Sequence, residues 1–159
     1  MDERSLLLKF WKSEAKATRA VLSRIPESAT YRPDPKSRPA REIAWQIVFE
    51  EIVLIEGLEK GTLEWADKPA PAKMADVLAA YDANHATLDK RLAALDAAKW
   101  EQSMPFLYQG KEVMKGRGAE HAWGFLFDIV HHRGQIATYL RPMGAKVPQI
   151  YGPSADEPM

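Results

Sequence analysis

The chain has 159 residues, a usual length for one domain and enough to bury a single core. Its 22 Lys and Arg residues balance 22 Asp and Glu residues, so net charge would attract neither nucleic acid nor an anionic membrane. The absence of cysteine excludes disulfides, thiolate metal ligands and a cysteine nucleophile from this chain. No apolar run reaches membrane-spanning length and the first residues are acidic, so we expect one cytoplasmic domain over residues 1–159.

The first predicted helix runs from about Arg4 to Ile25. Apolar residues recur there at intervals of three and four, the pattern of an amphipathic helix. Pro26 ends it, because the residue before a proline is disfavoured in helical dihedrals. The proline-rich residues that follow predict an extended connector up to Pro39.

The second predicted helix runs from Pro39 to about Lys60. Its apolar residues cover more than half of the circumference, so we expect it to be mostly buried. Gly57 lies inside this helix, where glycine costs about 1 kcal/mol relative to alanine. We therefore expect a packing reason for it, such as the close approach of another element.

The third predicted helix begins near Lys73 and carries an apolar stripe to Leu95, after a loop that starts at Gly61. Residues 106–113 read as two short extended runs around a Gln109-Gly110 turn, which predicts a small hairpin or a lid.

The fourth predicted helix spans about Ala119 to Arg141, and the last fifteen residues form an irregular tail rich in proline. Together these elements predict an all-α fold, a four-helix bundle with a short extended segment between helices three and four. Ligand sites of such bundles usually lie between facing helices.

Polar side chains at one-turn spacing mark the two helices that could hold such a site. Asp128 and His132 lie four residues apart on one face of the fourth helix, a spacing that lets two side chains bind one metal ion. Gln46 and Glu50 have the same spacing on the second helix. His121 lies on the line of His132, but about 16 Å away along the axis, too far to share an ion.

Five segments carry a resemblance to a known family. Residues 131–136 (HHRGQI), 138–141 (TYLR) and 144–156 (GAKVPQIYGPSAD) resemble the helix-four and tail signature of the DinB/YfiT-like family. Residues 41–46 (REIAWQ), preceded by 31–38 (YRPDPKSR), are similar to the second motif of that family. The resemblance covers nearly the whole chain and implies a DinB-type bundle, often dimeric, so we expect a homodimer.

The resemblance also implies a metal site. In the family, one histidine from helix two and two from helix four bind a divalent metal. Here Gln46 and Asp128 occupy two of these positions and only His132 is retained. The implied ligands are Gln46, Asp128 and His132, with Glu50 as a candidate fourth, for zinc, nickel or manganese. Because an amide oxygen is a weak ligand, we expect a lower affinity than that of a three-histidine site.

Two functions stay open. The resemblance implies a metal-dependent hydrolase, or a thiol-dependent transferase or isomerase, that acts on an unidentified small molecule; no catalytic residue is assigned. The alternative is a metal-free bundle, not an enzyme, that binds a small molecule or a protein partner in the inherited cleft. Asp128 and His132 would then form an ion pair on the helix surface or a buried hydrogen-bonded pair, Gln46 would bond one of them, and Glu50 would be solvated.

Arg133 falls within the apolar arc of the fourth helix. An unpaired buried charge is very unfavourable, so we expect a structural partner such as Glu56 or Asp156. For His85 and His121 we expect ordinary polar contacts.

Overall fold

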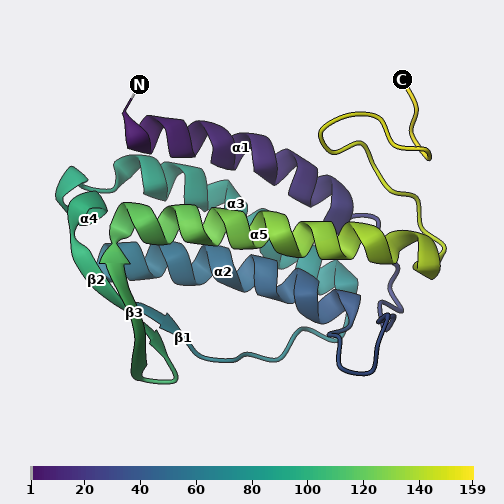
Figure 1. Cartoon of the computed structure of the whole chain (residues 1–159), viewed down its shortest axis with the longest axis horizontal. Helices are drawn as coiled ribbons and strands as arrows, with labels where there is room; N and C mark the ends of the chain where they lie inside the picture. Colours follow the sequence, from purple (N-terminus) through teal and green to yellow (C-terminus); the bar gives the residue numbers. More distant parts are fainter. Residues whose placement is uncertain (1) are drawn as a thin grey trace.

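The computed structural model describes residues 2–159 and has four long helices that lie side by side (Figure 1). They are α1 (Glu3–Leu22), α2 (Ala40–Lys60), α3 (Met74–Ala94) and α5 (Gly118–Leu140). Each of α1 and α2 packs against both α3 and α5, which closes a four-helix bundle around one core. The four helices predicted from the sequence are confirmed, with small shifts at their ends.

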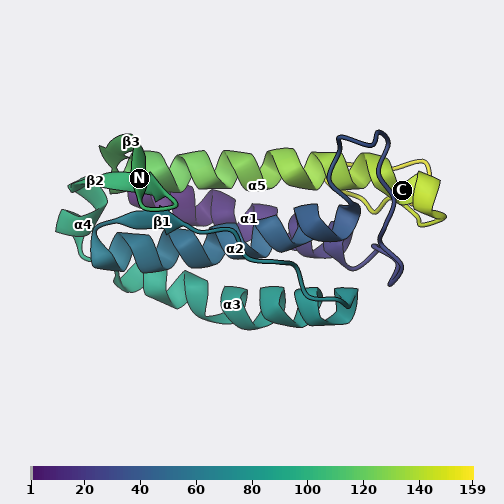
Figure 2. The ribbon, with the colours of Figure 1, turned by 90° about the horizontal axis from the view of Figure 1, so that it is seen from below.

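The order of the helices is not a simple up-and-down one. Helices α2 and α3 run in the same direction, because the connector between them travels back along the bundle (Figures 1 and 2). Helix α5 lies along one edge of the bundle and α3 along the opposite edge (Figure 2). This arrangement leaves α2 and α5 in direct contact over much of their length.

The all-α prediction holds for most of the chain but not for all of it, because the chain also forms a three-stranded mixed sheet. Strand β2 (Ser103–Tyr108) pairs antiparallel with β3 (Lys111–Arg117), and β1 (Leu63–Trp65) pairs parallel with β2. The predicted hairpin is confirmed: Gln109 and Gly110 form its turn with φ of 50° and 78°. A three-residue strand is too short to show alternation, so β1 could not be recognised from the sequence.

A short helix, α4 (Ala97–Glu101), was also not predicted. It joins α3 to β2, and Asp96 begins it by accepting a hydrogen bond from the Ala98 N–H at 2.9 Å. One turn of helix carries too little periodicity to be recognised from the sequence.

The expected packing reason for Gly57 is the first strand. A Cβ atom on Gly57 would lie 2.6 Å from Leu63 Cγ and 2.8 Å from Leu63 Cα. Leu63 is fully buried against α2 at this point. The glycine therefore allows β1 to lie directly on the helix.

Arg133 is buried and paired as expected, but its predicted partners are wrong. Its guanidinium lies 2.6 Å from a carboxylate oxygen of Glu14 on α1, and it donates to the Tyr151 hydroxyl of the tail. Asp156 pairs instead with Arg141, and Glu56 with Lys60. The partner on α1 is more than a hundred residues away, beyond what local spacing can indicate.

Within residues 2–159, no helix is both long and apolar enough to cross a membrane. The structure contains one chain, so the homodimer stays a prediction.

We predict that Gly57→Ala lowers the free energy of unfolding by about 1–3 kcal/mol, because the added methyl group overpacks against Leu63. Gly134 is the matched control: it lies in α5, and a Cβ there would meet no atom within 4 Å. Gly134→Ala should raise stability by up to about 1 kcal/mol through helix propensity. Urea denaturation measures both, and equal effects of the two substitutions would contradict this account.

Candidate metal centre

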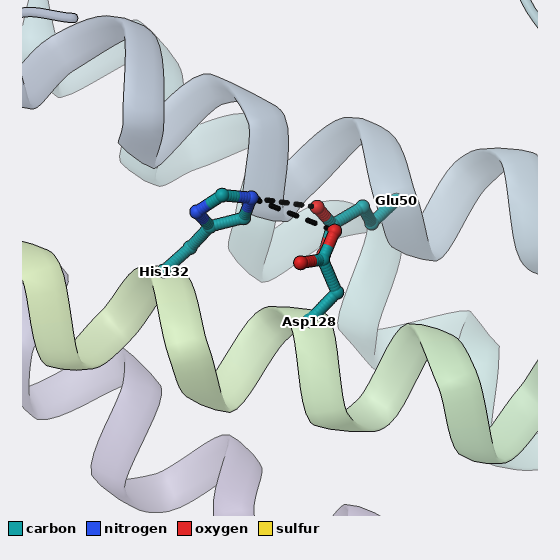
Figure 3. Close-up of side chains that lie close together, drawn as sticks. All are labelled: Glu50, Asp128 and His132. Carbon is teal, nitrogen blue, oxygen red and sulfur yellow. Dashed lines mark ion pairs between the residues drawn. The ribbon is translucent and has the colours of Figure 1, made fainter. Parts of the chain in front are cut away.

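Polar side chains from two facing helices meet between α2 and α5. Glu50 projects from α2, and Asp128 and His132 project from α5 (Figure 3). One ligand atom from each of the three lies within 4.8 Å of the others. A three-residue group of this kind can coordinate a single metal ion.

The imidazole of His132 points at both carboxyl groups. Its Nε2 lies 3.6 Å from Glu50 Oε1 and 3.5 Å from Asp128 Oδ2 (Figure 3). The side chains of Glu50 and His132 are 1% and 7% exposed, whereas that of Asp128 is 50% exposed. The group is therefore closed on the side of α2 and open beside Asp128.

A chain of polar contacts runs through the site from Arg38 to His131. Arg38 donates to the side-chain oxygen of Gln46, and the Gln46 amide nitrogen lies 2.6 Å from His132 Nε2. On the other side of the ring, His132 Nδ1 lies 3.0 Å from the oxygen of Gln135, whose amide nitrogen contacts His131. An amide oxygen can only accept, so His132 Nδ1 donates to Gln135, and Nε2 on the opposite side of the ring faces the two carboxyl groups.

Gln46 lies in the site as expected, but its amide presents nitrogen to it. That nitrogen donates to Glu50 Oε1 at 2.9 Å in addition to its contact with His132. The amide oxygen, which is the atom able to bind a metal, faces Arg38 instead. Coordination by Gln46 would require the amide to turn over and release Arg38.

Glu50 is buried, so the expectation of a solvated glutamate is wrong. Burial, reinforced by the neighbouring Asp128 carboxylate, raises the pKa of Glu50 from 4.5 to about 9. The hydrogen bond from His132 lowers the pKa of Asp128. At neutral pH the proton therefore resides on Glu50, and its buried Oε2 has no hydrogen-bond partner in residues 2–159.

A cavity of about 660 Å³ opens beside Asp128. Its walls are mainly apolar and come from β1, the hairpin and α5: Trp65, Phe106, Tyr108, Met114, Phe125 and Phe127. Glu50 and Gln46 also line it, so the candidate metal centre forms part of its wall. The sequence did not reveal this cavity, because its walls come from α2, β1, the hairpin and α5, which lie far apart along the chain.

The other three histidines, His85, His121 and His131, lie outside the group. His121 is buried at the cavity wall and bonds the Met104 carbonyl oxygen through Nε2 at 3.0 Å. His85 contacts the buried Glu51 at 3.1 Å in a separate cluster. Arg38 was not predicted as a site residue; it precedes α2 and reaches Gln46 across two helical turns.

The raised pKa of Glu50 predicts how the metal-free protein responds to pH. A carboxyl whose folded pKa exceeds its unfolded value stabilises less as pH rises between the two, here from 4.5 to about 9. The free energy of unfolding in EDTA should fall by up to about 1.4 kcal/mol per pH unit.

Glu50→Gln should make the free energy of unfolding depend less on pH. Glu56 is an exposed glutamate on the same helix, and Glu56→Gln should leave the dependence unchanged. Urea denaturation between about pH 5 and 8 measures the slopes. An unchanged slope in Glu50→Gln would show that this carboxyl does not carry the effect.

Comparison with known proteins gives the same fold. The chain is similar to the crystal structure of a DinB-like protein from Bacillus cereus, with a TM-score of 0.74 and 21% identity over 91% of this chain and 95% of that chain. It is also similar to a DinB-like protein from Bacillus subtilis, with a TM-score of 0.70 and 16% identity over 91% and 97% of the two chains. No curated protein matches it. The sequence profile of the DinB family matches residues 1–159, and the chain therefore belongs to the DinB family.

Proposed function

We propose that Glu50, Asp128 and His132 hold a divalent metal ion and that the chain is a metal-dependent enzyme acting on a small molecule. The observation that carries this proposal is the convergence of three ligand atoms within 4.8 Å from two facing helices. A cation between them would satisfy the unpartnered Glu50 Oε2 and replace the proton that Glu50 carries at neutral pH.

The donor set suits a first-row divalent metal. One imidazole and two carboxylates are good ligands for zinc and manganese, and nickel also accepts imidazole. Gln46, in the orientation described, serves best as a donor that holds Glu50 and His132 rather than as a ligand. Gln135 fixes the ring of His132 through Nδ1, as partners in the outer shell of metal sites commonly do.

A bound divalent ion would supply a Lewis acid that ionises water or a thiol near neutral pH, for hydrolysis or for thiol-dependent transfer or isomerisation. The chain would supply the rest. Asp128 stands at the open side, next to the apolar cavity, so a substrate in the cavity can reach the group. The aromatic walls would exclude water from most of the substrate surface.

One observation favours the alternative, a metal-free bundle that binds a small molecule in the same cavity. The Gln46 amide nitrogen lies 2.6 Å from His132 Nε2, so it stands where a metal bound to that nitrogen would lie. Metal binding must therefore displace this contact. The two functions differ in metal content and in the response to changes at position 46.

We expect the purified native protein to contain one divalent ion per chain. His132→Ala should reduce the metal content at least tenfold, because it removes the nitrogen ligand. His85→Ala is the matched control, since His85 lies in a separate cluster beside Glu51 and is not one of the three converging groups. Elemental analysis measures both variants. An equal metal content in His132→Ala and the native protein would reject the proposed site.

Gln46→His should raise zinc affinity by about tenfold or more, because an imidazole at this position adds a strong ligand to the set. Calorimetric titration of the EDTA-treated protein measures the change. Gln46→Leu provides the comparison, since it keeps the approximate volume and offers no ligand. If Gln46→His and Gln46→Leu bind zinc equally, position 46 does not face the ion.

A further inference from the structure

A second cavity, of about 500 Å³, lies on the other side of Gln46. It is formed by the first half of α2 and by the segment that follows β1. Gln46 and Trp65 line this cavity and also the cavity beside Asp128, which we call the aromatic cavity. The two cavities are therefore direct neighbours. We call it the basic groove, because Arg38, Arg41 and Lys68 line it.

The walls of the basic groove are held in place by helix α2. The Trp45 ring nitrogen donates to the Lys68 carbonyl oxygen at 3.1 Å. The Arg41 guanidinium donates to the Ala72 carbonyl oxygen at 2.8 Å. Both contacts tie the segment after β1 to the helix, so the groove does not need a ligand to form it.

The three cations of the groove lack acidic partners. Within residues 2–159, none of them lies within 4.0 Å of a carboxylate oxygen, whereas Arg19, Arg91, Arg117, Arg133 and Arg141 all do. The Arg41 Nε atom is also buried without a hydrogen-bond partner among the described residues. Cationic groups gathered in this way are suited to a ligand that brings its own negative charge.

Two carboxylates, Glu42 and Asp67, also line the groove, and they offset its positive charge only in part. Asp67 accepts hydrogen bonds from the Trp65 ring nitrogen and the Tyr108 hydroxyl, both at 3.0 Å. Glu42 is exposed. Three cations and two carboxylates leave one net positive charge, next to a cavity whose walls are mainly apolar.

We propose that the basic groove binds the carboxylate of an amphipathic small molecule whose apolar body lies in the aromatic cavity. The Arg38 and Arg41 guanidinium groups can donate paired hydrogen bonds to a carboxylate, and Lys68 adds a point charge. The inference that such an acid is the substrate rests on the proposed metal-dependent function. Its binding needs no metal, so the two proposals can fail separately.

The test compares two probes that differ in charge, 4-phenylbutyrate and 4-phenyl-1-butanol, by calorimetry on the EDTA-treated protein at neutral pH. The acid should bind at least about fivefold tighter than the alcohol at low ionic strength, and this preference should shrink in about 0.5 M salt. Lys68→Gln should weaken the binding of the acid by about fivefold and leave the affinity for the alcohol unchanged.

Lys90→Gln is the matched control, because Lys90 is an exposed lysine of α3 that lines neither cavity. Equal affinities for acid and alcohol, or no binding of either probe, would overturn the proposal. So would a preference for the acid that survives Lys68→Gln. A preference that appears only after zinc is restored would assign the carboxylate to the ion and not to the groove.

Discussion

The structure of the site depends on one contact, that between the buried carboxyl of Glu50 and the pair formed by Asp128 and His132 on α5. A carboxyl group is rarely buried without a partner, because loss of hydration strongly disfavours its charged form. In the metal-free protein a proton on Glu50 neutralises the buried carboxyl group at neutral pH. One of its oxygens still lacks a hydrogen-bond partner among residues 2–159. A divalent cation would replace that proton, which is why the same contact carries the proposed function.

The fold supports this contact from a distance. Gly57 allows Leu63 to lie directly on α2, and the strand that follows brings Trp65 to the walls of both cavities. The hairpin adds Phe106 from β2. The small sheet thus completes the surroundings of a site whose ligands all come from helices. Because Gly57 has no side chain, β1 can lie directly on α2, and this packing helps to determine the shape of both cavities.

The sequence predicted what depends on local spacing. Gln46 with Glu50, and Asp128 with His132, are one helical turn apart, and the structure brings all four side chains together between α2 and α5. What the sequence could not predict depends on contacts between distant segments. These are the parallel pairing of Leu63–Trp65 with β2, the pairing of Arg133 with α1, and the burial of Glu50. The orientation of the Gln46 amide is set by Arg38, outside the helix, and no pattern within α2 indicates it.

One ion between Glu50, Asp128 and His132 can be detected by X-ray absorption spectroscopy of the protein loaded with one equivalent of zinc. We expect the zinc to have a single imidazole nitrogen and otherwise oxygen atoms as ligands. A first shell with two or more imidazoles, or the spectrum of hydrated zinc, would contradict it.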